Sequence, residues 1–210
     1  MADRPVDAAS LLILDGNGPD ASVLMGRRSS AHAFMPDVYV FPGGRVDAGD
    51  RHARCTGALR AEDERRLLAG TPRPSPVRAR ALAVAALRET HEETGMVIGR
   101  LDGEALVPSL AALRYVGRAV TPPGRSRRFD ARFFACPRDA VRHESVPATD
   151  ELEDVRWVPL RDASAVPLAR ITAVMIEEVH DRLRRDPDLV ADLPVPRHRM
   201  LHRRFVREEH

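Results

Sequence analysis

The chain has 210 residues, of which 43% are hydrophobic and 30% are charged, so it can build a packed core and is not a disordered polymer. Its formal net charge is only +2 and the two signs are interspersed, which disfavours a nucleic-acid-binding protein. All 33 basic residues are Arg, so the chain has neither a phosphate-loop lysine nor a Schiff-base lysine.

The cysteines and the apolar runs bear on where the protein acts. Cys55 and Cys136 are the only cysteines and match no metal or redox spacing, so we expect reduced thiols in the cytoplasm. The clean apolar run at 81–87 is far too short to span a bilayer, and no signal-peptide core follows the first residues. We therefore expect a soluble, cytoplasmic protein with no membrane partner.

In chain order, the first elements predicted are strands. Residues 9–14 and 22–27 are apolar runs joined by turn-forming residues, which is typical of a β-hairpin. Residues 38–41 predict a strand that ends at Pro42-Gly43-Gly44. Residues 45–75 are polar, and we expect only one short helix there, at 61–68.

A longer helix is predicted over residues 76–94. Ser75 can cap its N-terminus, Pro76 suits the first helical position, and Gly95 can take the left-handed conformation that ends a helix. Strands are expected at 96–99, 112–121, 128–136 and 155–159, then an amphipathic helix at 168–184 and a polar tail at about 186–210. This mixture predicts a single α+β or layered α/β domain over residues 1–210.

Three acids share one face at the end of the longer helix. Glu89, Glu92 and Glu93 lie at positions i, i+3 and i+4, and their repulsion adds to the cost of anions at a helix C-terminus. A divalent cation among the carboxylates would remove this cost, because hard cations prefer oxygen ligands. The alternative is a solvated acidic face paired with arginines. Arg88 can hold an acidic side chain through a forked hydrogen bond.

The run Arg88-Glu89-Thr90-His91-Glu92-Glu93-Thr94-Gly95, preceded by Gly44 and Asp50, resembles the Nudix box. That box is a glycine, five residues, a glutamate, seven residues and then R-E-U-x-E-E-x-G-U, with U apolar. This chain has Asp50 in place of the first glutamate, Thr90 at an apolar position, and 37 residues, 51–87, in place of seven. Residues 51–74 lack the apolar periodicity of a core element, so we expect a surface excursion beside the active-site mouth.

The resemblance implies an α+β fold, the Nudix α/β/α sandwich with a mixed sheet, and an insertion within the Nudix box at about 51–74. By residue match, Glu89, Glu92, Glu93 and the backbone carbonyl of Gly43 would bind Mg²⁺ or Mn²⁺. Glu92 or Glu93, or an acid on a later loop, would activate water, and Arg88 would orient the acids. The reaction would be hydrolysis of a diphosphate linkage in a small nucleotide-like molecule.

The substrate contacts implied are Arg128, Arg132 and Phe41. Residues 121–134 are similar to a segment of an insertion-bearing Nudix branch that includes peroxisomal CoA diphosphatases; the alternative is a strand with Phe inward and Arg outward. Against CoA, Ala33 and Asp37 stand where the upstream motif of better-known CoA enzymes has Arg and Gly.

Several alternatives therefore remain open. The substrate is CoA or acyl-CoA, or else an ADP-ribose or NADH-type compound, and a non-catalytic nucleotide sensor is the third reading. Strand alternation places Arg128 and Arg132 on one face and Phe129 and Phe133 on the other, so one face cannot serve both a phosphate and an apolar arm. The polar tail is solvated or forms a homodimer contact.

Overall fold

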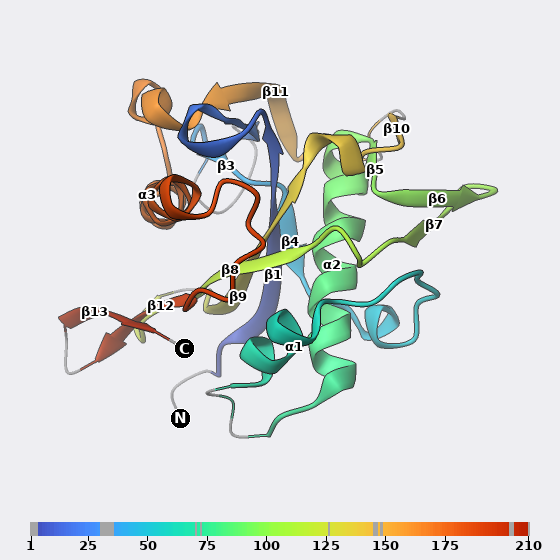
Figure 1. Cartoon of the computed structure of the whole chain (residues 1–210), viewed down its shortest axis with the longest axis horizontal. Coiled ribbons are helices and arrows are strands. Elements are labelled where there is room, and N and C mark those ends of the chain that lie inside the picture. Colours follow the sequence, from blue (N-terminus) through green and yellow to red (C-terminus); the bar gives the residue numbers. More distant parts are fainter. Residues whose placement is uncertain are drawn as a thin grey trace.

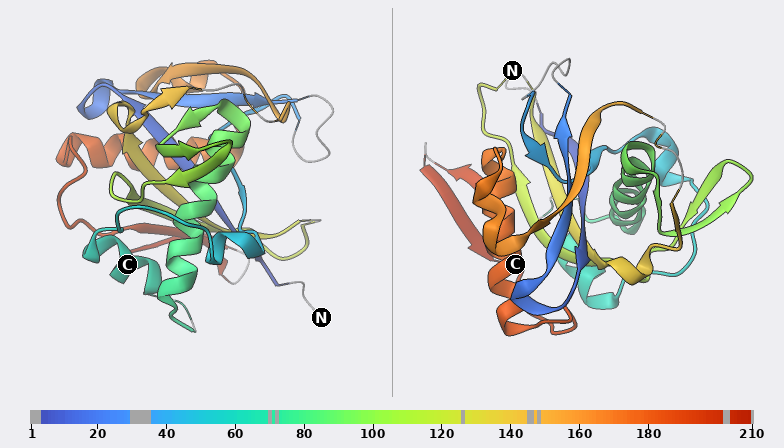
Figure 2. Two further views of the ribbon diagram at one scale, coloured as in Figure 1. Left: turned by 90° about the vertical axis from the view of Figure 1, so that its right-hand side faces the viewer. Right: turned by 90° about the horizontal axis from the view of Figure 1, so that it is seen from above.

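The computed structural model describes residues 4–29, 36–69, 71, 73–125, 127–144, 147, 149–201 and 204–209. Its centre is a mixed β-sheet with the strand order β11-β2-β1-β9-β8-β12-β13, and β3 and β4 pair with β2 and β1. Helices α1 and α2 cover one face of the sheet and α3 covers the other, as Figures 1 and 2 show. The predicted α/β/α sandwich with a mixed sheet is confirmed.

The helices are α1 (Ala61–Leu68), α2 (Pro76–Thr94) and α3 (Arg170–Arg185). The strands of the main sheet are β1 (Val6–Asp15), β2 (Ser22–Arg28), β3 (Tyr39–Val40), β4 (Gly43–Arg45), β8 (Arg114–Val120), β9 (Phe129–Pro137), β11 (Leu152–Pro159), β12 (Pro196–Leu201) and β13 (Arg204–Glu209). Two small hairpin-like sheets pair β5 (Met96–Val97) with β10 (His143–Glu144) and β6 (Gly99–Asp102) with β7 (Ala105–Pro108).

The central strand β1 explains the three layers. Its side chains alternate, so that Leu11 and Ile13 pack in the core under α2, while Leu12 and Leu14 pack in the core under α3. Because both faces are covered there, residues 11–14 of the strand are apolar without interruption. β1 pairs antiparallel with β2, as the predicted hairpin requires, and parallel with β9.

Helix α2 has the bounds that its local signals predict. The Ser75 side chain accepts a hydrogen bond from the backbone of Arg78 at 3.3 Å, and Gly95 ends the helix with φ +73°. Thr90, at a position where the Nudix box is usually apolar, is fully buried. Its hydroxyl donates to the carbonyl oxygen of Ala86 at 2.7 Å, so the polar atom is satisfied inside the helix.

Helix α1 forms where it is predicted, but it is not a surface excursion. Leu67 is 3% exposed and belongs to the same core as Ala79 and Leu82 of α2. Asp63 is fully buried, and its carboxylate accepts a hydrogen bond from the backbone N–H of Tyr115 at 3.1 Å.

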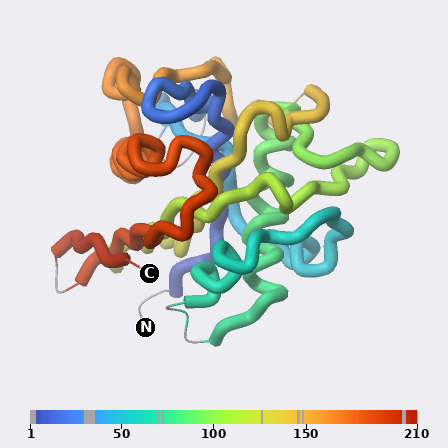
Figure 3. Tube along the Cα trace, viewed as in Figure 1, coloured from blue at the N-terminus to red at the C-terminus, as the bar shows by residue number. Residues whose placement is uncertain are grey.

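The position of α1 also corrects the prediction for residues 51–74. Leu82 precedes Glu89 by about two helical turns, roughly 10 Å, so α1 lies beside the N-terminal half of α2 rather than at the acids (Figure 3). The expected surface excursion beside the active-site mouth is therefore wrong for this helix. The start of the segment, next to Asp50, adjoins the acidic end of α2, where Asp50 contacts Arg88.

The polar C-terminal tail also joins the fold. β12 pairs parallel with β8 and antiparallel with β13, so the sheet continues into the segment that we predicted to be a polar tail, solvated or in a dimer contact. The sequence did not predict these strands because their side chains are rich in charge. His198, for example, is polar, yet it is 4% exposed and contacts Glu178 of α3 at 3.0 Å.

Ala33, which the sequence analysis compared with the upstream motif of CoA enzymes, lies outside the described residues. No described helix meets the length and apolarity needed to cross a membrane.

Candidate active site

Arg88 is the centre of the site at the C-terminal end of α2. Its Nε and Nη2 atoms donate to the two carboxylate oxygens of Asp50, at 2.9 and 3.1 Å. Its Nη1 atom donates to Glu89 and to Glu92, at 3.0 Å each. Burial acts to lower the pKa of Arg88, but the hydrogen bonds and charges of these acids raise it. Arg88 thus contacts three acids, Asp50, Glu89 and Glu92, as the predicted orienting role requires.

Glu93 lies apart from this arginine, against the glycine turn. The backbone N–H of Gly43 donates to Glu93 Oε2 at 2.8 Å. Burial raises the pKa of Glu93 to about 8, and the charges of Glu89 and Glu151 add to the rise, while the Gly43 hydrogen bond opposes it. The resemblance implies that the backbone carbonyl of Gly43 binds a metal, whereas the structure shows the backbone N–H of Gly43 donating to the carboxylate of Glu93.

The two glycines of the turn leave space for different neighbours. A Cβ on Gly44 would lie 2.4 Å from Oε1 of Glu89, so the missing side chain makes room for this carboxylate. Gly43 has φ +152°, and a Cβ there would lie 2.4 Å from the carbonyl oxygen of Ala9. A glycine is therefore required at position 43 because of the nearby backbone and at position 44 because of the Glu89 carboxylate.

Two residues that the sequence reasoning did not name also lie near the site, Glu151 on a later loop and Arg28 at the end of β2. The backbone N–H of Thr149 donates to the carbonyl oxygen of Glu92 at 3.2 Å, which ties this loop to the end of α2. Burial lowers the pKa of Arg28, and the charges of Glu93 and Glu151 oppose this, so the three groups are neighbours. The acidic run at 150–154 was the available signal for Glu151; Arg28 had none.

The donor groups suit a divalent cation. Within the described ranges, no three Asp, Glu, His or Cys side chains are already gathered as a ligand set, because Arg88 holds Glu89 and Glu92. Burial raises the pKa of Glu89 as well as that of Glu93, and a hard cation among these oxygens would lower both. The residues that would hold Mg²⁺ or Mn²⁺ are Glu89, Glu92 and Glu93.

Two of the three predicted substrate contacts are contradicted. Arg132 is 1% exposed and lies between the sheet and α2, where its Nη1 atom contacts Asp130 at 2.6 Å, so it cannot reach a substrate phosphate. Phe41 is 4% exposed and packs edge-on against Phe133, with 6.3 Å between ring centroids, in the core under α3.

The alternative for this strand, with Phe inward and Arg outward, is also wrong. Arg132 and Phe133 do point to opposite faces, but helices cover both faces. Arg128 remains half-buried before β9, where its Nε donates to the carbonyl oxygen of Thr121 at 3.3 Å.

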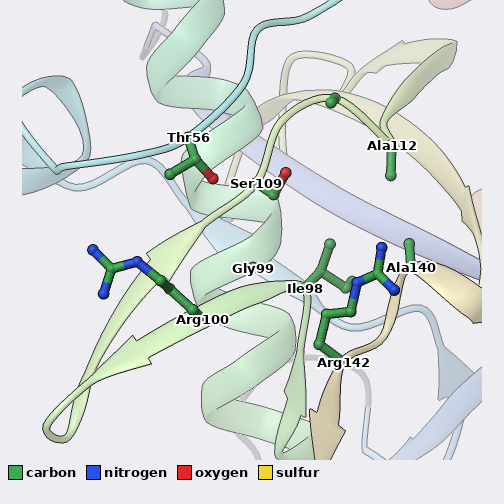
Figure 4. A pocket seen from close by; sticks show the side chains of 9 residues that line it. Thr56, Ile98, Gly99, Arg100, Ser109, Ala112, Ala140 and Arg142 are labelled. Carbon is green, nitrogen blue, oxygen red and sulfur yellow. The ribbon is translucent and has the colours of Figure 1, made fainter.

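A cavity of about 310 Å³ lies on the other side of α2, and Figure 4 shows Thr56, Ser109 and Arg142 around it. Arg80 contacts Cys55, next to Thr56, and precedes Glu89 by nine residues, about two and a half turns. The two residues therefore project from opposite sides of the helix. The cavity does not share the acid-bearing side of α2.

A buried helix that delivers carboxylates to a glycine turn beside the central strand of a mixed sheet defines a class of metal-dependent hydrolases. Residues 67–179, more than half of the chain, match the NUDIX domain. The chain therefore belongs to the Nudix hydrolase family.

The relatives agree with this assignment. The chain is 35% identical to the acyl-coenzyme A diphosphatase NUDT19 of Gallus gallus over 144 residues, which cover 50% of this chain and 37% of that protein. The chain thus spans well under half the length of this relative. A NUDIX hydrolase from Alicyclobacillus acidocaldarius superimposes with a TM-score of 0.61 and 29% identity, over 84% of this chain and 91% of the other.

A third comparison concerns the fold alone. The NUDIX domain of Shewanella oneidensis NrtR, solved with ADP ribose, superimposes with a TM-score of 0.53 at 16% identity, over 86% of this chain and 90% of the other.

Proposed function

We propose that this Nudix hydrolase cleaves the diphosphate linkage of CoA or an acyl-CoA, with Mg²⁺ or Mn²⁺ as the cofactor. The observation that carries the hydrolytic part is the acid cluster that Arg88 and the Gly43-Gly44 turn hold in place. The similarity to an acyl-coenzyme A diphosphatase supports the substrate class.

The residues of the site have separable roles in this proposal. When bound, the cation would polarise the diphosphate and acidify the attacking water. Arg88 holds Glu89 and Glu92 beside the turn, and Glu93 faces Gly43. Because burial raises its pKa to about 8, Glu93 holds a proton at neutral pH in the absence of a cation. Glu151, which is exposed on the adjacent loop, is the acid we propose to accept the proton from water.

We also infer that residues 51–74 are an insertion within the Nudix box of a single domain. Two observations support this inference. The match to the NUDIX domain starts only at residue 67, yet Asp50, which lies before the segment, contacts Arg88, which lies after it. The segment thus separates two parts of one site.

The substrate class is tested by comparing kcat/KM for CoA, dephospho-CoA and ADP-ribose with Mg²⁺ and with Mn²⁺, the products being identified by mass. We expect CoA or an acyl-CoA to be preferred, with cleavage to 3′,5′-ADP and the phosphopantetheine product. If ADP-ribose is cleaved best and dephospho-CoA equals CoA, the CoA proposal fails. If no diphosphate is cleaved with either metal, the nucleotide-sensor alternative replaces it.

Arg128 is the remaining candidate for contact with the 3′-phosphate. We expect Arg128→Ala to raise KM for CoA about tenfold or more while leaving KM for dephospho-CoA unchanged, because charge-assisted contacts are worth about 1.5–3 kcal/mol. Arg125→Ala is the matched control, since Arg125 is exposed in the same loop. Equal effects of Arg128→Ala on both substrates would show that Arg128 does not recognise the 3′-phosphate.

Cytoplasmic location and a homodimer are further proposals. β13 is at the end of the strand order, and Phe205 on it is 40% exposed, which supports a contact between two copies along this hairpin. Light scattering after size-exclusion chromatography tests the dimer, and a monomeric mass at micromolar concentration would exclude it. Cell fractionation tests the location.

A further inference from the structure

The cavity beside α2 has no part in the hydrolytic site described above. Its walls come from Thr56, from the two ends of the β6–β7 hairpin and from the segment 140–142 (Figure 4). Its volume of about 310 Å³ is roughly twice that of a cavity that holds one benzene molecule, so it has room for about a dozen non-hydrogen atoms. A cavity of this size is large enough for a small organic ligand.

Backbone hydrogen bonds hold the walls of this cavity together. The N–H of Ser109 donates to the carbonyl oxygen of Ile98 at 3.0 Å, and the N–H of Arg142 donates to that of Val97 at 2.8 Å. Thr56 forms an isolated parallel bridge with Ser109. Segments that are far apart in the sequence are thus fixed against one another, so the cavity is a built part of the fold.

The floor of the cavity is apolar. Ile98 and Ala140 line it and are 3% and 9% exposed, because they belong to the hydrophobic core under α2. Ala112 also lines it and packs against the same core. A ligand that covers these side chains removes apolar surface from water, which favours binding. The floor therefore selects a ligand with an apolar part.

The rim of the cavity is positively charged. Within the part of the chain that the structure describes, the guanidinium of Arg142 makes no hydrogen bond or ion pair. Arg100, which extends on the side away from Arg142 in Figure 4, is 3.8 Å from Asp102, and Asp102 lies closer to Arg54, at 3.1 Å. Both rim arginines are exposed, so they stay charged and can turn toward an anion.

We propose that this cavity binds a small carboxylate with a short aliphatic chain, of about the size of octanoate. The carboxylate accepts a forked hydrogen bond from Arg142 and a further one from the hydroxyl of Ser109, which also lines the cavity. The chain covers Ile98 and Ala112. Inorganic phosphate would bring no apolar surface to this floor, and octanol would bring no charge to Arg142. Binding requires neither a divalent cation nor the acids of α2, since the cavity lies on another side of that helix.

The direct test is a titration of the unaltered, ¹⁵N-labelled protein with octanoate in EDTA, followed by NMR. We expect saturable shifts of the backbone signals of Gly99, Ser109 and Ala112, with a Kd of about a millimolar or below, as is usual for a ligand of this size. Shifts that appear at Glu89–Glu93 instead, or shifts that do not saturate, would overturn the proposal. Because no substrate is used, the result does not depend on the proposed function.

The two parts of the ligand are tested separately. Arg142→Gln should weaken the binding of octanoate about tenfold or more, because a charge-assisted contact is lost, and folding should be unaffected at this exposed position. Ala112→Leu keeps both arginines but fills part of the cavity, so it should weaken binding as well. Arg161→Gln, which changes an exposed arginine on the α3 side of the sheet, is the matched control and should bind as the unaltered protein does.

Octanol and inorganic phosphate complete the test with the unaltered protein. We expect each to bind at least about tenfold more weakly than octanoate, since each lacks one of the two contacts. Binding of octanol as tightly as octanoate would show that the arginines do not recognise the charge. Equal binding of phosphate would show that the apolar floor contributes nothing. Either result would refute a carboxylate with an aliphatic chain as the ligand.

Discussion

Arg88 and Asp50 are separated by 37 residues of sequence, yet the guanidinium of Arg88 holds both carboxylate oxygens of Asp50, at 2.9 and 3.1 Å. Asp50 is 2% exposed, so it holds the Nε and Nη2 atoms of Arg88 in one place. The Nη1 atom, which does not contact Asp50, is thereby directed to Glu89 and Glu92. Asp50 is thus a positioning residue that acts through Arg88.

Asp50→Asn should therefore lower kcat about 10–100-fold, the usual loss when the group that orients a metal ligand is removed. Asp50→Glu, which introduces the residue that the Nudix box usually has, should retain much more activity. The measurement is kcat and KM as a function of Mg²⁺ concentration for both variants. If Asp50 had a purely structural role, both variants would lose the same amount of folded protein, and the molecules that fold would have a normal kcat.

Replacing the helix acids should remove activity without unfolding the protein. Glu93→Gln and Glu92→Gln should each lower kcat by about two orders of magnitude or more, because each change removes a carboxylate that would hold the cation. Glu104→Gln, in the exposed β6–β7 turn, is the matched control and should behave as the unaltered enzyme. Normal turnover of either helix variant at saturating metal would refute the role of that acid.

The two glycines of the turn should respond differently to alanine. Gly43→Ala forces a residue with φ +152° and a Cβ 2.4 Å from a backbone oxygen, so Tm should fall and little folded protein should form. The atoms nearest to a Cβ in Gly44→Ala belong to the movable carboxylate of Glu89, so this variant should fold but lose about tenfold or more of kcat. Unfolding curves and kcat for both variants distinguish these effects; a stable, active Gly43→Ala variant would contradict the first.

The buried acid Glu93 should make the metal-free protein less stable as pH rises. Its pKa is about 8 when folded, against 4.5 as the ordinary value, so between these values the folded state binds a proton that the unfolded state does not. Stability conferred by this proton is present at low pH and is lost as pH rises toward 8, by a few kcal/mol at about 1.4 kcal/mol per pKa unit.

Unfolding in EDTA at pH 5.5 and 8.5 measures this effect. Glu93→Gln should reduce the difference between the two pH values but not abolish it, because the pKa of Glu89 is raised in the same direction. Mg²⁺ should restore stability at high pH. The same pH dependence in Glu93→Gln as in the unaltered protein would show that another group is responsible.

The buried carboxylate of Asp63 should matter for stability and not for chemistry. Asp63→Ala leaves the Tyr115 backbone N–H and the Nε–H of Arg60 without the acceptor they have here, so the free energy of unfolding should fall by about 3–5 kcal/mol. Glu62→Ala, at the exposed neighbouring position, should cost little. Denaturant unfolding and kcat per folded molecule are the measurements. A large loss of kcat at normal stability would instead show that the segment 51–74 contributes to the active site.

Much of the fold follows from local patterns, and the misses have physical causes. The bounds of α2, Pro76–Thr94, could be predicted because a capping serine and a proline at its start and a glycine at its end each act within one turn of the helix end they mark. The strands β12 and β13 could not, because their charged side chains are stabilised by ion pairs such as Arg199 with Glu208, which form only once the strands are adjacent.

The sequence by itself determined the Nudix helix and the shared face of Glu89, Glu92 and Glu93, because helical spacing is a local property of the chain. It also determined that Arg132 and Phe133 point to opposite faces of β9. Only the tertiary structure decided that both faces are covered, since the covering helices come from distant segments. Burial then turned Arg132 from a predicted phosphate contact into an internal cation.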